Sequence, residues 1–396
     1  MVKKNWPFGQ TIQSPIAWLN LLHVFNDGFL ASLPLLLPFI QKDLGIEFSK
    51  IGLLTGLLNS AGVILALPAA SIAMLLGGYR VLIISMFLYS AAFIIIGLSS
   101  GFIIITFAFV LASIGFGLFH PISFALIANN SYQNDIGNRM GNFTAVGDIG
   151  RVGIAACVTV LVSIINWRNT AFIYGGFPII IAFFAYAFFY KKGYTPISTG
   201  EKRISKVHGL HSSKEYIIAI LTGFIDSLAS SSLFVFIPFL FVYRGASTAI
   251  LGALSGAFFV GNMLGKILIG KITDQIGCKR VFIISEILMS ILLIVISSIK
   301  SVVMISVISV MLGAVTKGTV PVINTLVAKA VPDHRLNEKA FSIVSFVSGI
   351  AAVISPLLLG FIAQRYSIVF VFYISACFAV IAVLPVLISK AIYRVT

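Results

Sequence analysis

The chain has 396 residues, of which 59% are hydrophobic and only 10% are charged. Soluble domains carry roughly a quarter charged residues, so this composition excludes a soluble enzyme. Long apolar runs recur from Ile16 to the C-terminus, and the ~10-residue alternating strands of a membrane barrel would not produce them. The sequence therefore predicts an all-α polytopic membrane protein.

The apolar runs divide into segments of the length that a membrane-spanning helix needs, about 20 residues. They predict twelve transmembrane helices, at residues 14–41, 49–76, 79–99, 102–128, 139–165, 168–190, 215–243, 247–270, 281–299, 301–328, 340–363 and 367–390. Outside these spans, eighteen Lys and Arg fall on the side of the N-terminus and six on the other side. The positive-inside rule then places both termini in the cytoplasm. The positive charges that make up the net charge of +15 thus indicate the orientation of the chain in the membrane. No nucleic-acid partner is expected.

A polar, basic segment interrupts this pattern at residues 191–214. We interpret it as a cytoplasmic linker between an N-terminal six-helix bundle, residues 1–190, and a C-terminal six-helix bundle, residues 215–396. A constant offset of 200 residues aligns Pro38 with Pro238, Arg80 with Arg280, and Pro121 with Pro321. This register indicates a parallel internal repeat of six spans each.

The segment GKITDQIGCKR, from Gly270 to Arg280, resembles the signature loop of the major facilitator superfamily. The matching residues are Gly270, Asp274, Gly277, Lys279 and Arg280, whereas Gln275 departs from the usual Arg. The resemblance implies a cytoplasmic loop that caps neighbouring helix ends and acts as a gate held by charge. The equivalent first-half loop has Leu75 where the Asp is expected.

Two further motifs, HVFNDG from His23 to Gly28 and GLFHP from Gly117 to Pro121, resemble segments of the fosmidomycin-resistance-type exporters of that superfamily. The resemblance implies a proton-driven antiporter in a bacterial inner membrane, exporting a small phosphonate-like anion. Gly147, Gly150 and Gly153 match part of the antiporter signature of the fifth helix, although no proline follows them.

Polar residues in the first predicted helix form the main candidate proton site. His23 lies three and four residues before Asn26 and Asp27, so one helical face carries all three. Ionisable groups at membrane depth are functional-site hypotheses because each costs about 2.5 to 3.5 kcal/mol to insert. Asp27 could bind and release a proton with His23 beside it, or the cluster could be structural. Asp226, which aligns with Asn26 in the repeat, is the next candidate.

Two basic residues at membrane depth, Arg151 and Lys317, are candidate substrate ligands together with Asn26 and His120, and Asp148 is a further proton-coupling candidate. Arg151 lies three residues after Asp148, so the two could neutralise each other, or a substrate could compete with Asp148 for Arg151. Lys317, beside Gly318, lies deep in its span with no acidic partner expected nearby.

The remaining ionisable residues in the spans are assigned less firmly. His120, next to Pro121, could titrate or could satisfy the backbone that the proline frees. Lys266 and Glu286 are expected to lie close to the cytoplasmic end.

These observations predict a secondary active transporter, a proton-coupled antiporter that exports a small anionic compound. The alternative is a proton-coupled importer of a polycarboxylate, siderophore or nutrient. A channel or an intramembrane enzyme is a remote third hypothesis, because the sequence contains neither a filter-like repeat nor a catalytic constellation. No cofactor, metal site or ATP-binding loop is expected. The expected partners are the substrate, protons and the lipid bilayer, and the expected state is a monomer.

Overall fold

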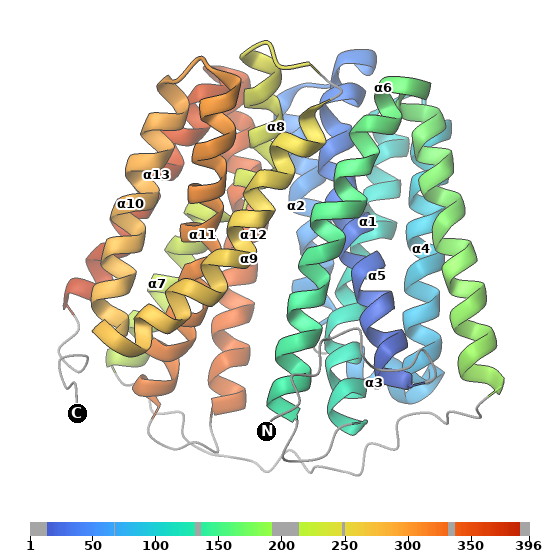
Figure 1. Cartoon of the computed structure of the whole chain (residues 1–396), viewed down its shortest axis with the longest axis horizontal. Helices are drawn as coiled ribbons and strands as arrows, with labels where there is room; N and C mark the ends of the chain where they lie inside the picture. Colours follow the sequence, from blue (N-terminus) through green and yellow to red (C-terminus); the bar gives the residue numbers. More distant parts are fainter. Residues whose placement is uncertain are drawn as a thin grey trace, which may run out of the picture. The chain divides into compact units, whose positions relative to one another are not determined.

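A computed structural model of the chain describes residues 14–66, 68–130, 136–191, 214–247, 250–331 and 337–388. Over these residues the regular elements are helices, shown in Figure 1. Their bounds are α1 (Pro15–Leu44), α2 (Phe48–Ile64), α3 (Ala69–Leu76), α4 (Gly78–Leu98), α5 (Phe102–Asn129), α6 (Ile136–Lys191), α7 (Lys214–Ser230), α8 (Leu233–Tyr243), α9 (Leu251–Ile276), α10 (Cys278–Ser298), α11 (Val302–Ala330), α12 (Asn337–Arg365) and α13 (Ile368–Ile388).

The helices account for the twelve predicted spans. Ten are long and apolar enough to cross a membrane, and an eleventh span results when α2 and α3, which meet at 71°, are counted together. The 56 residues of α6 would extend about 84 Å at 1.5 Å per residue, far beyond a ~30 Å hydrocarbon core. Asn166 divides this helix with a left-handed φ of 68°, so α6 contains two spans.

Two spans are broken at places that the apolar pattern alone does not mark. Leu65, Ala66 and Pro68 lie between α2 and α3, and Pro68 immediately precedes α3. Residues 231–232 separate α7 from α8. Pro68 lacks the backbone N–H that would bond to Ile64 in a continuous helix, although Pro34 and Pro38 lie inside α1 without breaking it.

The predicted gate loop is mostly helical. The helix α9 continues to Ile276, six residues past its predicted end, and α10 begins at Cys278. Gly277 alone makes the turn, with a φ of 87°, as Gly77 does between α3 and α4 with a φ of 89°. Residues other than glycine rarely adopt this backbone conformation. The segment between the predicted spans 247–270 and 281–299 is therefore helix except for this one-residue turn, and Gly77 and Gly277, which are 200 residues apart, make the same turn in the two halves.

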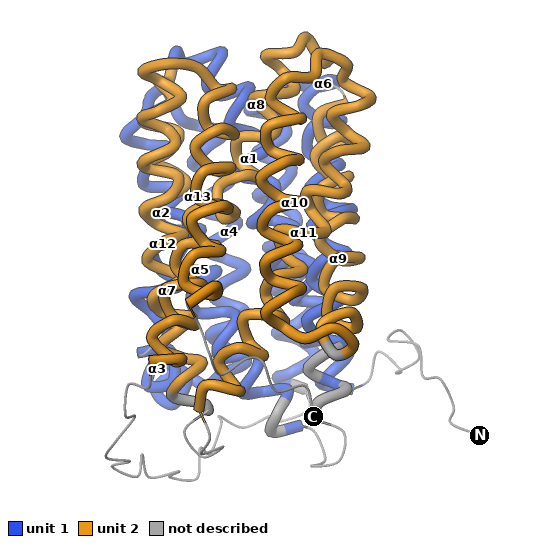
Figure 2. The backbone as a smooth tube through the Cα atoms, turned by 90° about the vertical axis from the view of Figure 1, so that its left-hand side faces the viewer, with its two compact units in different colours: residues 1–45, 57–201 blue, residues 46–56, 202–396 orange. Residues whose placement is uncertain are grey.

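The chain divides into two compact units, coloured separately in Figure 2. Unit 1 comprises Met1–Gly45 and Leu57–Glu201, and unit 2 comprises Ile46–Gly56 and Lys202–Thr396. Within unit 2, the beginning of α2 contacts α12, because the Phe48 backbone N–H donates to Gln364 Oε1 at 2.8 Å.

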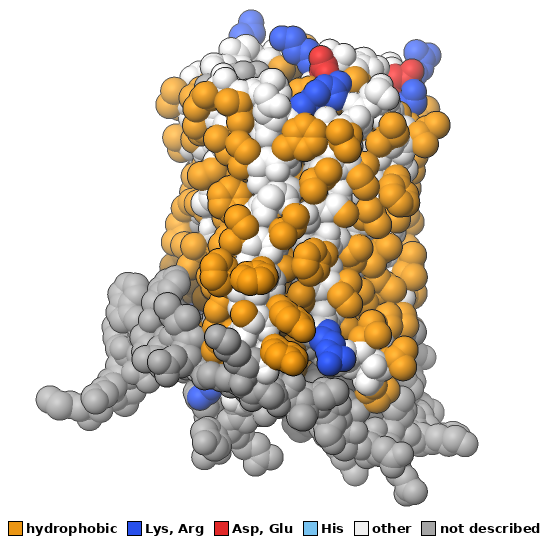
Figure 3. Space-filling model, turned by 90° about the vertical axis from the view of Figure 1, so that its right-hand side faces the viewer, with side chains coloured by type: hydrophobic (Ala, Val, Ile, Leu, Met, Phe, Trp, Pro, Cys, Tyr) orange, Lys and Arg blue, Asp and Glu red, His pale blue; other side chains and the backbone are white. Residues whose placement is uncertain are grey.

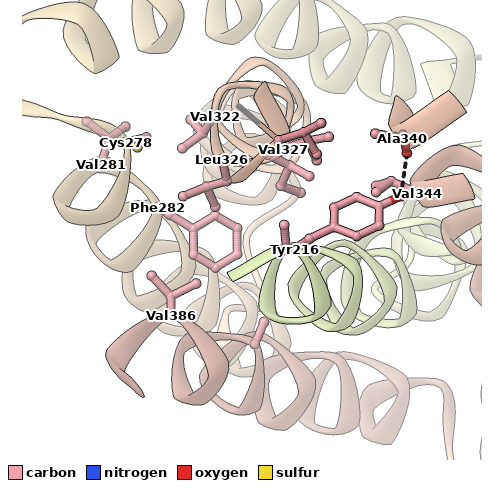
Figure 4. Packing of buried hydrophobic residues seen from close by; sticks show 14 residues of the cluster. Tyr216, Cys278, Val281, Phe282, Val322, Leu326, Val327, Ala340, Val344 and Val386 are labelled. Atoms are coloured by element: carbon pink, nitrogen blue, oxygen red, sulfur yellow. Dashed lines mark hydrogen bonds between the residues drawn. The ribbon is translucent and has the colours of Figure 1, made fainter. Parts of the chain in front are cut away.

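The core of unit 2 is a cluster of buried apolar side chains from α7, α10, α11, α12 and α13 (Figure 4). Phe282 is fully buried among these helices. The Tyr216 hydroxyl, the polar group drawn in this cluster, donates to the backbone oxygen of Ala340 at 3.0 Å. The cluster joins five helices of this unit.

The outside of the helices is apolar, as expected for contact with lipid. Figure 3 shows a face with hydrophobic side chains along most of its length and charged side chains near its ends. On α6, for example, Ile180, Phe183 and Phe184 are 53%, 65% and 57% exposed. In water such surface would be unfavourable, so this exterior is the surface of a membrane protein.

Candidate functional site

Asp27 is the centre of a buried polar cluster in unit 1. Its carboxylate is within 2.8 Å of Arg151 NH2, 3.3 Å of His23 Nε2 and 3.4 Å of His120 Nε2. The Asn26 amide donates to Asp27 Oδ1 at 3.0 Å. These side chains come from α1, α5 and α6, so three helices converge on one carboxylate. Asp27 itself is only 2% exposed.

Arg151 links this carboxylate to a second one. Its NH1 donates to Asp148 Oδ1 at 3.2 Å while its NH2 pairs with Asp27 Oδ2. Asp148 is buried, and the Arg151 side chain is 24% exposed. The planar guanidinium presents several donors in a fixed geometry, which suits such bridging. Arg151 therefore pairs with two carboxylates. A simple self-neutralising pair would join Arg151 to Asp148 alone.

The His23 ring shows where a further proton would fit. Its Nδ1 lies 2.7 Å from the backbone oxygen of Phe143, and since a carbonyl only accepts, Nδ1 carries the hydrogen. A neutral ring then directs the lone pair of Nε2 at Asp27 Oδ2, 3.3 Å away. A proton on either His23 or Asp27 would convert this contact between two acceptors into a hydrogen bond.

Glycines on α6 let the helix approach α1 at this site. A Cβ on Gly147 would lie 2.6 Å from Asp27 Oδ2 and 2.7 Å from His23 Nε2. A Cβ on Gly150 would collide with the backbone of Val24. The absent side chains thus make room for the cluster and bring Arg151 within reach of Asp27.

The same cluster contains a possible metal-ligand set. One ligand atom each from His23, Asp27 and His120 lie within 4.8 Å of one another. Carboxylate and imidazole suit several transition metals. However, the Arg151 guanidinium lies 2.8 Å from Asp27 Oδ2, so a cation already neutralises this carboxylate. The electrostatics favour the ion pair over a metal.

The second-half candidates form a separate cluster inside unit 2. Thr319 of α11 donates to Asp226 Oδ1 of α7 at 3.0 Å. Asp226 also interacts with Glu286 of α10 and with the charge of Lys317. The expectation that Lys317 has no acidic partner nearby is therefore wrong. Glu286, expected to be shallow, is 0% exposed and lies well inside α10.

The predicted gate residues are only partly described. Lys279 is 8% exposed, and its Nζ donates to the backbone oxygen of Leu387 at 3.2 Å. Arg280 is exposed, and Gly270 faces Pro321 of α11. The side chain of Asp274 lies outside the described residues. The gate role of this segment stays a prediction.

Sequence reasoning identified most members of both clusters, because charged side chains stand out in apolar spans. It missed Glu286, Thr319 and the backbone oxygen of Phe143. Glu286 carried a signal, an acidic residue within a span, but counting from the predicted end of its helix placed it too near the surface. The contacts of Thr319 and Phe143 depend on helix packing and had no sequence signal.

Comparison with known proteins identifies a family and a relative of this chain. The family model of the Major Facilitator Superfamily matches residues 19–215 and 219–394. A protein of Lactococcus lactis subsp. lactis (strain IL1403), described as a multi-drug resistance efflux pump PmrA homolog, is 24% identical over 259 residues. That match covers 63% of this chain and 64% of the relative, less than two thirds of the relative's length.

Solved structures share the fold at low sequence identity. The nucleoside transporter NupG has a TM-score of 0.75 and 15% identity, over 95% of this chain and 99% of that one. A bacterial homolog of the human lysosomal transporter Spinster, inward-facing and unoccupied, has a TM-score of 0.71 and 16% identity, over 96% and 95% of the two chains. The helices, the buried charges and the family match lead to one conclusion: this chain belongs to the Major Facilitator Superfamily and is a multi-pass membrane transporter rather than an enzyme.

Proposed function

We propose that this secondary transporter moves a small anionic compound in a proton-coupled cycle centred on Asp27 and Arg151. The observation that carries the proposal is the 3.3 Å contact between His23 Nε2 and Asp27 Oδ2, where one proton would complete a hydrogen bond, beside an arginine shared by two carboxylates. A phosphonate or carboxylate group would be the ligand of Arg151, because its geometry matches the guanidinium.

The coupling follows from competition for Arg151. An anion that binds the guanidinium weakens its bonds to Asp27 and Asp148. A buried carboxylate is costly to keep ionised once it has lost its cation. Protonation of Asp27 therefore becomes more favourable. His23 and His120, both within 3.4 Å of Asp27, are the neighbours through which that proton would pass.

For the direction of transport, we place export by antiport first on the likeness to exporters, whereas the linkage at Arg151 favours the symport described below. The support is the relative described as a multi-drug resistance efflux pump and the two motifs that resemble exporters. In this form the protein would lie in a bacterial inner membrane as a monomer with both termini in the cytoplasm. Protons would enter while the anion leaves, as two six-helix bundles alternate in access.

Import by symport is a second candidate, favoured by the shared arginine itself. If anion binding at Arg151 promotes protonation of Asp27, the proton and the anion bind together more readily than either binds alone. Positive linkage of this kind is what a symporter needs. The sign of the response to a pH gradient separates the two candidates.

The experiment uses purified protein in proteoliposomes. The substrate is the small anion that gives the largest thermal shift in a screen of phosphonates and carboxylates. An acidic interior should drive its uptake under antiport, and an acidic exterior should drive it under symport. We expect Asp27→Asn to abolish either response while anion exchange without a gradient continues.

Asp43→Asn is the matched control, because Asp43 is half-exposed and pairs with Arg168 at 3.2 Å. It should keep the response to the gradient. Gradient-driven uptake that is equal in wild type and Asp27→Asn would reject the role of Asp27.

A further inference from the structure

Unit 2 contains a second buried acidic group, which the mechanism above does not use. Asp226 of α7 is 4% exposed and Glu286 of α10 is 0% exposed. Their side chains interact directly, although the residues are 60 positions apart in the sequence. The arrangement is therefore a product of helix packing, with α11 in contact with both helices.

The hydrogen bonds around this pair are incomplete. Neither Glu286 Oε1 nor Oε2 has a hydrogen-bond donor among the described residues. The hydroxyl of Thr319 lies 3.0 Å from Asp226 Oδ1 and also 3.0 Å from the backbone oxygen of Thr316. A hydroxyl has one hydrogen, so it can serve only one of these acceptors at a time.

One proton would supply the hydrogen bond that is missing between the two carboxyl groups. Ionised carboxylates only accept hydrogen bonds, whereas a protonated carboxyl group also donates. A proton on Glu286 would give Asp226 a donor, and a proton on Asp226 would let Thr319 donate to Thr316 instead. Buried polar groups are normally satisfied in this way, because an unmade hydrogen bond costs about 1 to 3 kcal/mol.

The surroundings make two negative charges unfavourable. Phe282, one turn before Glu286, and Val322, three residues after Thr319, belong to the apolar cluster of Figure 4. Lys317 is the cation that acts on Asp226, so two ionised carboxylates would leave a net charge of −1. A single shared proton makes the group neutral in a site where charge is costly.

Two other titratable groups on the neighbouring helices have partners elsewhere. Lys279, on α10, donates to Leu387 of α13 at 3.2 Å. Tyr373, on α13, interacts with Ser297 and Ser298 near the opposite end of α10. The charged groups that act on Asp226 and Glu286 are these two carboxyls and Lys317.

We propose that Asp226 and Glu286 form a proton-binding carboxyl pair that shares one proton through a carboxyl–carboxylate hydrogen bond. This site lies in unit 2 and is separate from Asp27. The existence of this site does not depend on the proposed function. Only its role in transport does, since a proton bound here would be available to a proton-coupled cycle. Release of the proton would strengthen the attraction of the pair for Lys317 and so weaken the hold of Lys317 on an anion.

The test is infrared spectroscopy of the purified, full-length protein in detergent at neutral pH, without substrate or gradient. We expect the carbonyl stretch of a protonated carboxyl group in wild type, with a shift in D2O. Glu286→Gln should lose this band, because the Gln amide can donate to Asp226 and the shared proton is no longer held. Asp226→Asn should lose it as well, which provides a second variant if the first does not fold.

Two controls separate this proposal from the proposed function. Asp27→Asn should retain the band even if it abolishes transport, and Glu47→Gln, at the exposed position just before α2, should retain it too. A folded wild type without the band, or a band that persists in both Glu286→Gln and Asp226→Asn, would overturn the carboxyl pair. Either result would leave the role of Asp27 unaffected.

Discussion

Arg151 has an unusual electrostatic position because one guanidinium serves two buried carboxylates. Asp27 lies 2.8 Å and Asp148 3.2 Å from its nitrogens. If both acids are ionised and both neighbouring histidines are neutral, these three side chains carry one net negative charge. A proton on His23, His120 or Asp27 restores neutrality, so protonation and the ion-pair geometry are coupled at the level of single residues.

The bridging role predicts that lysine cannot replace Arg151. A single ammonium group cannot reproduce the two bonds that the guanidinium makes to separate carboxylates. Charge-assisted hydrogen bonds contribute about 1.5 to 3 kcal/mol, so Arg151→Lys should weaken anion binding about tenfold or more. The measurement is calorimetry in detergent with the anion selected by thermal shift. Arg168→Lys, whose partner Asp43 is half-exposed, is the control and should bind normally; equal affinity for Arg151→Lys would count against the bridge.

Lys317 provides the corresponding test in unit 2. If it contributes to an anion site, Lys317→Gln should weaken binding of the same anion by about ten- to a hundredfold. Because Asp226 is its acidic neighbour, the variant must first show a thermal stability equal to that of wild type. Lys271→Gln, at an exposed position of α9, should have no effect. Unchanged affinity in Lys317→Gln, or a best ligand that is a cation, would return Lys317 to a structural role.

At the scale of elements, the contact between α1 and α6 positions the unit 1 cluster. Gly150 faces the backbone of Val24, and a Cβ there would also lie 3.1 Å from the Gly28 nitrogen. Backbone cannot move aside as a flexible side chain can. The distance between the two helices, and with it the reach of Arg151 to Asp27, therefore depends on a glycine at this position.

A pair of alanine substitutions tests this packing. Gly150→Ala should lower the free energy of unfolding by about 1 to 3 kcal/mol, as overpacking usually does, and should slow anion exchange. Gly153→Ala is the matched control, because nothing lies within 4 Å of its Cβ position and alanine is the better helix former. Thermal unfolding in detergent gives both values. Equal melting temperatures for the two variants would contradict the close approach.

Much of this element-scale structure could be predicted because apolar length and loop residues mark each span. The predicted spans 102–128 and 301–328 differ from α5 and α11 by at most two residues at each end. Sequence could not show the break between α7 and α8, nor that α9 continues to Ile276, since helical continuity there depends on contacts with neighbouring helices. The pairing of Asp226 with Glu286 was hidden for the same reason.

At the scale of the whole molecule, each unit holds an acid and a cation inside otherwise apolar helices. Unit 1 has Asp27 with Arg151, and unit 2 has Asp226 with Lys317. Each such charge costs about 2.5 to 3.5 kcal/mol at membrane depth, and pairing offsets this cost only in part. Charges retained at this cost are consistent with a transporter that exchanges its internal ion pairs for contacts with substrate and proton.

The most direct test of this account is the number of protons that the purified protein takes up or releases when it binds an anion. Titration of the anion into detergent-solubilised protein, by calorimetry in buffers of different ionisation enthalpy, yields that number. We predict proton uptake in wild type, because an anion that binds Arg151 favours protonation of Asp27, and loss of this uptake in Asp27→Asn at retained anion binding. The same number of protons in wild type and Asp27→Asn, or none in wild type, would contradict the coupling of anion to proton through Asp27.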